Sequence, residues 1–283
     1  MNKPENCKAL TPLRYPGGKS KVIKKLLAPK FPEEFNSFYE PFIGGGSVSI
    51  FIAQMYPEKN VYINDLNPKL TNFWNYLKNS PIELVESLHK IRDAFDPNNP
   101  EKGKELLGKM TQILYEDDSE TLKKAISYYV LNKISFSGMT EHASLSKEAY
   151  RKTFNHGNIN RLIEISSHMN NFEIKNEHFI HPMVNAEEND FTFLDPPYMI
   201  ESSNLYGKNG EMHKGFDHEE FLNSVKNLYG KWMITYNDNE WIRESYKDYK
   251  IEDAEYTYFM AFETNEDGDK KTRKKNELII TNY

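Results

Sequence analysis

The sequence of 283 residues contains a single cysteine, Cys7, and no long apolar run. One cysteine excludes an internal disulfide framework, and without an apolar stretch of about 20 residues no helix is expected to span a bilayer. The first residues, 1–6, are polar and lack the apolar stretch of a secretory signal. We therefore expect a cytoplasmic protein, or an intracellular one in a host cell if the chain is viral, without a membrane partner. We expect a monomer or a weak dimer.

A surplus of basic residues is also missing. Lys and Arg number 36 against 42 Asp and Glu, which gives a net charge of −6. This counts against nucleic-acid binding, because phosphate contacts normally appear as a basic surplus. The local field depends on where the charges lie, however, and basic residues cluster within 19–25, 147–152 and 270–275. Such clusters are equally typical of a solvated surface, so they give DNA binding only support.

Short apolar runs that end in turn residues predict β-strands. They lie at 38–42, 61–63, 191–194, 232–235, 256–262 and 278–280. Between the second and third runs the apolar residues take helical spacing, at 70–77, 84–95 and 122–130, with a proline-flanked loop at 96–100. A further helical face at 221–228 precedes the fourth strand. The pattern predicts an α/β sheet with a helical block inserted into one crossover, closed by an antiparallel hairpin across a polar loop, 264–276.

The first strand runs into three glycines and then into a helical stretch, 48–56. Glycines at such a turn let the backbone approach a ligand closely, although an ordinary strand-to-helix turn has the same pattern. About twenty residues on, the next strand ends at Asp65, whose carboxylate could accept hydrogen bonds from a ribose or cap a helix. The candidate cofactor-binding residues in these two segments are Glu40, Phe42, Ile43, Gly44, Gly46, Ser47 and Asp65.

The sequence Asp195-Pro196-Pro197-Tyr198 directly follows the apolar strand 191–194. It therefore lies at the carboxyl end of a strand, where open α/β sheets bind their ligands. Adjacent prolines fix the backbone and remove two N–H donors. An exocyclic amine that donates one hydrogen to the Asp195 carboxylate and one to the Pro196 carbonyl would aim its lone pair at an electrophile. Tyr198 offers a flat face for an extruded base, so these four residues are the catalytic candidates; a rigid loop with a packed tyrosine is the alternative.

The segment 13–20, Leu-Arg-Tyr-Pro-Gly-Gly-Lys-Ser, ends like a phosphate-binding loop. The match fails because Leu13 stands where the first glycine is required and no apolar strand precedes it. A better interpretation is that Tyr15 packs on a planar ligand and that Lys19 meets a carboxylate.

These motifs, in this order, resemble the Dam-like DNA adenine-N6 methyltransferases of the D12 class. The matching segments are 14–19, 40–47, 64–67 and 195–198. The resemblance implies a Rossmann-like, S-adenosylmethionine-dependent methyltransferase sheet with an inserted, mostly helical target-recognition lobe. It implies a catalytic domain of 1–66 and 176–283 and a DNA-reading insert of 67–175. The implied partner is double-stranded DNA, and S-adenosylhomocysteine is the cofactor product. The resemblance leaves two roles open, protection against a companion restriction endonuclease and regulatory methylation without one.

The resemblance also implies roles for single residues. Tyr15, Lys19, Asp65 and Asp195 would contact S-adenosylmethionine, and Asp195 and Tyr198 would form the adenine pocket. Two departures from the family limit the transfer. Residues 140–153 differ from the usual hairpin, so the common target GATC is not assumed. The usual aspartate near 174–180 is missing, and either His178 or Asn176 replaces it or the contact is absent.

Candidate DNA contacts are weaker, because aromatic and basic residues have other common roles. In the insert they are Phe136, Arg151, Lys152 and Asn155, and around the glycine-punctuated segment 207–215 they are Tyr206 and Phe216. The two aromatics near that segment are equally expected as lid or core packing.

We expect direct in-line transfer of a sulfonium methyl group to N6 of an adenine that is flipped out of the duplex. No metal is expected, because the spacings of a zinc site are missing, and no Pro-Cys nucleophile is present. Two alternatives remain. One is another amino-methyltransferase, acting on cytosine N4 or on a protein glutamine, although the latter class usually has asparagine in place of Asp195. The other is a nucleic-acid-binding protein without catalysis, which the presence of Asp195 and Tyr198 opposes.

Overall fold

The computed structural model describes residues 2–116, 120–140, 143–199, 215–264 and 270–283, of which 255–264 and 270–275 are described as backbone only. The chain forms a mixed seven-stranded sheet in the order β3-β2-β1-β4-β5-β7-β6. The strands are β1 (Ser37–Glu40), β2 (Asn60–Asn64), β3 (Phe172–Lys175), β4 (Phe191–Leu194), β5 (Lys231–Asn237), β6 (Lys250–Thr264) and β7 (Lys270–Thr281). The strands β1 to β5 pair in parallel, whereas β7 is antiparallel to both of its neighbours.

The strand order reverses between β1 and β4. From β1 the chain proceeds through β2 to β3 in one direction, and it then returns to β4 and proceeds to β5 in the other. In open α/β sheets such a switch point, at the carboxyl ends of the strands, is where ligands bind. The topology therefore places the expected site where Glu40 ends β1 and Asp195 follows β4.

Alternating side chains of the central strands fill hydrophobic clusters on the two faces of the sheet. On β5, Met233 belongs to one cluster, whereas Trp232, Ile234 and Tyr236 belong to the other. The first cluster includes α1 (Ser47–Met55) and continues into the helical insert. The second packs beneath α8 (Ile180–Val184), α10 (His218–Lys226) and α11 (Glu240–Ser245).

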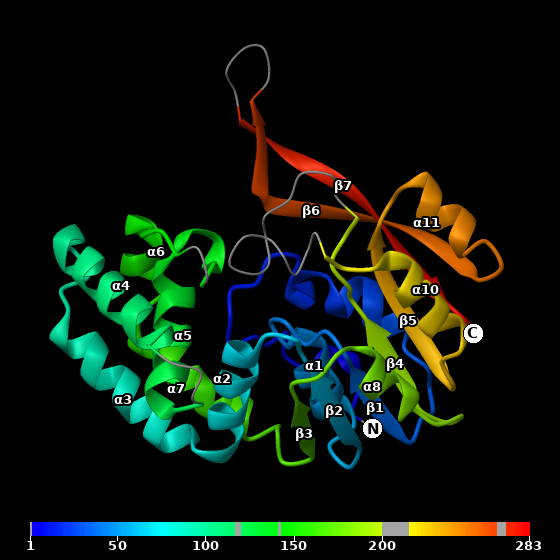
Figure 1. Cartoon of the computed structure of the whole chain (residues 1–283), viewed down its shortest axis with the longest axis horizontal. Helices are drawn as coiled ribbons and strands as arrows, with labels where there is room; N and C mark the ends of the chain where they lie inside the picture. The colour runs from blue at the N-terminus through cyan, green and yellow to red at the C-terminus, as the bar shows by residue number, and fades with distance from the viewer. Residues whose placement is uncertain (1, 117–119, 141–142, 200–214, 265–269) are drawn as a thin grey trace.

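The helical insert follows β2 and precedes β3 in the sequence, and in space it lies beside the sheet (Figure 1). Its α-helices are α2 (Pro68–Asn79), α3 (Pro81–Ala94), α4 (Pro100–Leu114), α5 (Leu122–Ile134), α6 (Lys147–Lys152) and α7 (His156–Ser166). The last four residues of the predicted insert, 172–175, form β3 and pair with β2, so they belong to the sheet. No helix in the part of the chain that the structure describes has the length and apolar character of a membrane span.

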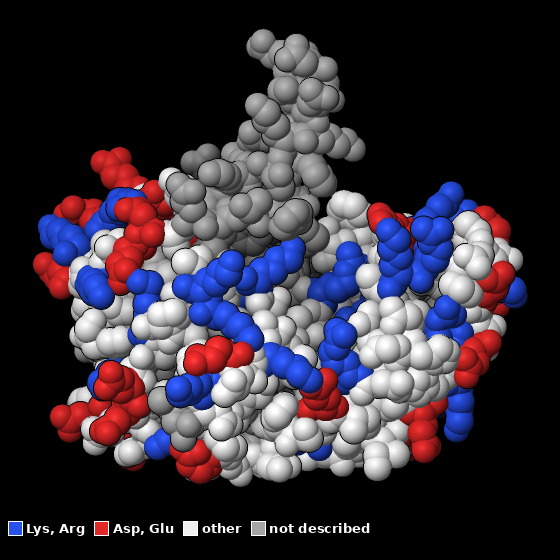
Figure 2. All heavy atoms as spheres, turned by 180° about the vertical axis from the view of Figure 1, so that it is seen from behind, with Lys and Arg blue, Asp and Glu red and all other residues white. Residues whose placement is uncertain are grey.

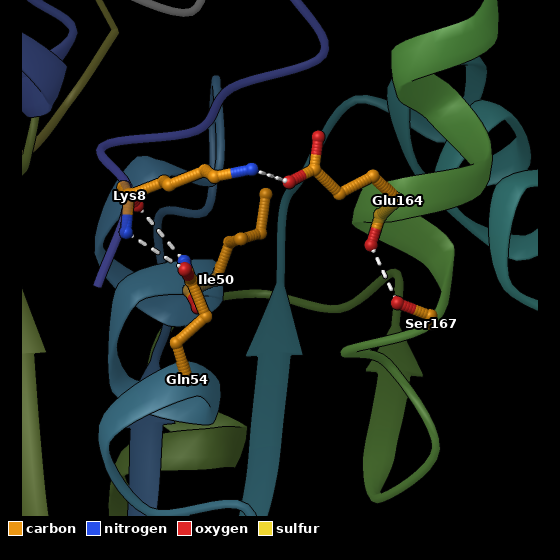
Figure 3. Close-up of polar contacts among 5 residues, drawn as sticks. All are labelled: Lys8, Ile50, Gln54, Glu164 and Ser167. Atoms are coloured by element: carbon orange, nitrogen blue, oxygen red, sulfur yellow. Dashed lines mark hydrogen bonds and ion pairs between the residues drawn. The ribbon is translucent and has the colours of Figure 1, made fainter. Parts of the chain in front are cut away.

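The N-terminal segment ties the sheet to the insert (Figure 3). The backbone N–H of Lys8 donates to the side chain of Gln54 on α1, and the Gln54 amide donates back to the Lys8 carbonyl, at 2.8 and 2.9 Å. The ammonium of Lys8 pairs with Glu164 on α7. This ion pair is exposed, so it orients the segment more than it stabilises the fold.

The predicted strands and the closing hairpin are confirmed. The structure adds β3, which was not among the predicted strands, and residues 250–255 at the start of β6. Two further differences concern the ends of predicted elements. The first predicted strand ends two residues early, at Glu40, because the chain turns toward the glycine loop. The polar run 270–276 was predicted as loop but is paired with β6 as part of β7, since cross-strand pairing outweighs the charge of the sequence. The hairpin of β6 and β7 extends well beyond the end of β5 (Figure 1). The strand β5 pairs with β7 only as far as Glu277.

Candidate active site

A cavity of about 380 Å³ lies at the switch point of the sheet. It is lined by residues from the predicted motifs, namely Tyr15, Lys19, Glu40, Phe42, Ile43, Gly44, Gly46, Ser47, Asp65, Asp195, Pro197 and Phe216. Residues of the insert, on α5 and in the loop after that helix, also line the cavity and were not predicted, namely Tyr128, Gly138, Met139 and Thr140. The separate sequence motifs therefore converge on one cavity.

The glycine loop after β1 is held between two aromatic rings. A Cβ atom built on Gly44 would lie 2.8 Å from the ring of Tyr15, and one built on Gly46 would lie 2.4 Å from the ring of Trp74. Both glycines also have positive φ angles, 44° and 66°. The indole N–H of Trp74 donates to the Gly44 carbonyl at 3.3 Å. The loop requires glycine for space and for conformation, and it lines the cavity in this form.

Glu40 is buried at the base of this cavity, where it caps α1. Its carboxylate accepts hydrogen bonds from the backbone N–H of Ser49, at 3.0 Å, and from the Ser49 hydroxyl. Burial raises the pKa of Glu40 to about 8, although the two hydrogen bonds from Ser49 act in the opposite direction. Glu40 is therefore mostly protonated at neutral pH, and its first role is to hold the helix that follows the glycine loop.

The ends of β2 and β3 form the next wall. The carboxylate of Asp65 accepts from the backbone N–H groups of Gly44, at 3.2 Å, and of Asn67, at 3.0 Å. It thus links the glycine loop to the start of α2. Where the family's aspartate is missing, His178 lines the cavity, whereas the Asn176 amide donates to the Asp65 carbonyl at 2.8 Å. Of the two predicted replacements, only His178 lies where a ligand could be met.

Lys19 and Asp195 form the charged centre of the site although 176 residues separate them in the sequence. The Lys19 ammonium donates to both oxygens of Asp195, at 2.8 and 2.7 Å, to the Tyr198 hydroxyl at 3.1 Å and to the Gly17 carbonyl at 2.8 Å. Burial acts to lower the pKa of Lys19, but the neighbouring carboxylates, Asp195 foremost, outweigh it and raise the pKa. Lys19 was expected to meet a carboxylate, and the carboxylate it meets is that of Asp195.

The catalytic loop 195–198 is supported by β5, which the sequence did not indicate as part of the site. The Thr235 hydroxyl donates to Asp195 Oδ1 at 2.7 Å. The rings of Tyr198 and Tyr236 stack with their centroids 6.0 Å apart. Phe216 packs near Phe42 and His218 on the same side of the sheet, so this predicted residue belongs to the aromatic wall of the cavity.

Of the other predicted DNA contacts, those that the structure describes lie outside the cavity. Phe136 is 61% exposed at the turn after α5. Arg151 is exposed, and Lys152 pairs with Glu148 at 2.7 Å. Asn155 caps α7, since its side chain accepts from Asn158 N–H at 2.8 Å and donates to the Lys152 carbonyl at 2.7 Å. Tyr206 lies outside the described residues. Among the described residues, no three His, Cys, Asp or Glu side chains gather as metal ligands.

The sequence from residue 15 to residue 260 matches the family described as D12 class N6 adenine-specific DNA methyltransferase. The chain belongs to this family. The matched region includes every motif that lines the cavity. As a member of this family, the protein is an α/β enzyme that methylates adenine in DNA.

Curated relatives are named as methyltransferases, one of them as a DNA adenine methylase. The Type II methyltransferase M1.LlaDCHI of Lactococcus lactis subsp. cremoris is 28% identical over 95% of this chain and 94% of its own. The Type II methyltransferase M.MjaIII of Methanocaldococcus jannaschii is 28% identical over 66% of this chain and 68% of its own. The DNA adenine methylase of Haemophilus influenzae is 27% identical over 47% of this chain and 43% of its own. The Lactococcus relative, which matches nearly the whole of both chains, is named a Type II methyltransferase.

Proposed function

We propose that the enzyme uses S-adenosylmethionine to methylate N6 of an adenine that is flipped out of duplex DNA into the cavity at the ends of β1 and β4. The main support for this proposal is that the glycine loop after β1 and the loop that begins at Asp195 line the same cavity. We infer that S-adenosylhomocysteine is the product and that the reaction takes place in the cytoplasm, where the DNA is accessible.

The cavity fits a nucleoside cofactor on the side of the glycine loop. A side chain at Gly44 or Gly46 would overlap the ring of Tyr15 or Trp74, so glycine at these positions lets both rings pack against the loop that lines the cavity. Asp65, at the carboxyl end of β2, is placed to accept hydrogen bonds from a ribose, and its backbone partners fix its position. When bound, S-adenosylmethionine supplies an electrophilic methyl group on a sulfonium.

The Asp195 carboxylate is the acceptor for the amine of the substrate. A carboxylate offers about four lone-pair sites, two on each oxygen. Lys19 and Thr235 both donate to Oδ1, whereas Lys19 alone among the described residues donates to Oδ2. We assign the N6 hydrogen bond to Oδ2 and the second amine hydrogen to the Pro196 carbonyl. Lys19 and Thr235 hold the Asp195 carboxylate in place, and the chemistry rests on positioning, without a covalent enzyme intermediate.

The charge distribution supports DNA binding in spite of the net charge. On the face shown in Figure 2, Lys and Arg side chains gather across the middle of the molecule, whereas Asp and Glu lie mainly toward its margins. We propose that the insert reads the target sequence and that Phe136, exposed beside the loop that lines the cavity, contacts the bases. The Type II relatives support a companion restriction endonuclease as a functional partner.

The test uses purified protein, radiolabelled S-adenosylmethionine and mixed-sequence duplex DNA, followed by digestion to nucleosides. Label is expected in N6-methyladenine; label in cytosine or in polypeptide would favour the rival amino-methyltransferases. Asp195→Ala should reduce turnover by on the order of 10³-fold. Asp253→Ala, which removes an exposed carboxylate on β6 that pairs with Arg243, serves as the control with full activity. An Asp195→Ala protein that methylates like the control refutes the proposed mechanism.

A further inference from the structure

The last three residues of β5 each contact the loop that carries the chemistry. Thr235 donates to Asp195 Oδ1 at 2.7 Å, and the Tyr236 ring stacks on Tyr198. The Asn237 side chain makes two hydrogen bonds to the backbone of Met199. Its Oδ1 accepts from the Met199 N–H at 3.0 Å, and its Nδ2 donates to the Met199 carbonyl at 3.1 Å.

These contacts begin where the backbone ladder between β4 and β5 ends. The last pair in the register is Leu194 with Ile234. Pro196 and Pro197 have no N–H to donate, so the sheet cannot hold the following residues by regular backbone pairing. Asn237 replaces that ladder, because its amide offers Met199 the acceptor and the donor that a neighbouring strand would have offered. The catalytic loop is thereby fixed at both ends, by Thr235 at Asp195 and by Asn237 at Met199.

We infer that the carboxyl end of β5 orients Asp195 and Tyr198 for methyl transfer and that Asn237 is a positioning residue for the base pocket. The inference rests on the proposed function of that pocket. Tyr236 completes the support on the other face of the sheet. It is fully buried, and its hydroxyl is hydrogen-bonded to the imidazole of His218 at the start of α10. The Tyr198 ring therefore stacks on a neighbour that is itself held in place.

The chain contains a matched control for Asn237. At the opposite end of β5, Asn282 makes the same pair of bonds to the backbone, accepting from Trp232 N–H at 2.8 Å and donating to the Gly230 carbonyl at 2.9 Å. Asn237→Ala and Asn282→Ala each remove one amide that bonds to backbone at an end of β5, although Asn282 itself follows β7. Only the former amide touches the catalytic loop, so a difference between the variants in activity isolates positioning from stability.

The experiment measures kcat, the KM for S-adenosylmethionine and the thermal unfolding midpoint of both variants and of the wild-type enzyme on duplex DNA. In Asn237→Ala we expect kcat to fall on the order of 10²-fold, as for a displacement of about 1 Å at a reacting group. The KM for the cofactor should stay within about twofold, because Asn237 does not line the cavity. Asn282→Ala should keep the wild-type kcat.

Asn237→Asp provides a second variant should the alanine protein fold poorly. It keeps the acceptor for Met199 N–H and loses the donor to the carbonyl, so its kcat should lie between those of the wild-type and alanine proteins. The inference is overturned if Asn237→Ala loses no more kcat than Asn282→Ala, or if its loss appears only as a raised KM for the cofactor. A wild-type protein that leaves adenine unmethylated counts against the proposed function instead, so the two failures are distinguishable.

Discussion

Replacement of Glu40 by glutamine should remove a large part of the pH dependence of stability between pH 5 and pH 8. The side chain is 3% exposed and hydrogen-bonded to Ser49, and burial raises its pKa from 4.5 to about 8. Between these two pH values the folded protein holds a proton that the unfolded chain has released. Stability therefore falls as the pH rises through this window. Below pH 4.5 both states are protonated, and above pH 8 both are ionised.

The size of the effect follows from the difference between the two pKa values. The two pKa values differ by about 3.5, and each pKa unit corresponds to about 1.36 kcal/mol. The protein can therefore lose at most about 5 kcal/mol of unfolding free energy across this pH range through Glu40. Rearrangement around the ionised carboxylate, which lies near Lys19, reduces this limit, so we expect about 2 kcal/mol or more. Glutamine is similar in size and keeps an oxygen for Ser49, but it does not titrate.

The assay is urea unfolding of the two proteins at pH 5.5, 7.0 and 8.5 without cofactor. The difference in unfolding free energy between glutamine and wild-type proteins should shift in favour of glutamine as the pH rises, which isolates Glu40 from all other titrating groups. Glu58→Gln, at an exposed position, is the control whose difference from wild type should not change with pH. If the unfolding free energies of Glu40→Gln and wild type change with pH in parallel, Glu40 has the same pKa in the folded and unfolded protein, and the prediction is wrong.

Three further substitutions test other parts of the site. Lys19→Met should reduce kcat by about 10²-fold or more, measured by methyl transfer at saturating cofactor, because Asp195 loses its charged partner; an active methionine variant would contradict this. Gly46→Ala should lower the free energy of unfolding by about 2 kcal/mol or more in urea, since its Cβ would overlap Trp74 at a positive φ; unchanged stability would refute the packing argument. Phe136→Ala should weaken DNA binding about 10-fold in a gel-shift titration and leave cofactor affinity as in wild type, because the ring is exposed; equal DNA affinity would exclude a base contact.

The sequence allowed most of the strands and the motifs of the site to be predicted, because each motif is local. The glycine loop and the Asp195 loop are fixed by short runs of glycine or proline next to an apolar strand. The helix α4 was missed although its buried residues, Gly103, Leu106, Met110 and Leu114, follow helical spacing. The spacing of these four residues therefore already indicates a helix in the sequence.

The partners of the motif residues were harder to predict, because they are set by topology. Lys19 meets Asp195 only once the N-terminal segment crosses the end of β4. In the sequence, residues 235–237 look like an ordinary strand end. Their contacts with the Asp195 loop exist only because β5 lies next to β4 in the sheet. Asn155 was predicted as a DNA contact, and the structure gives its side chain a further role as the cap of α7. A polar side chain at a helix start satisfies nearby backbone donors first.

The insert and the catalytic centre share the segment that carries Lys19. The Asn132 amide, buried on α5, donates to the carbonyls of Arg14 and Gly138, each at 2.8 Å, and its oxygen accepts from the Arg14 N–H at 2.9 Å. Arg14 precedes Tyr15, which lines the cavity, and the same short segment reaches Lys19. Because a buried, fully bonded amide is costly to displace, the position of α5 fixes where this segment begins. The lobe proposed to read DNA and the ammonium that orients Asp195 are therefore joined through a few residues of main chain, with Asn132 as the connection.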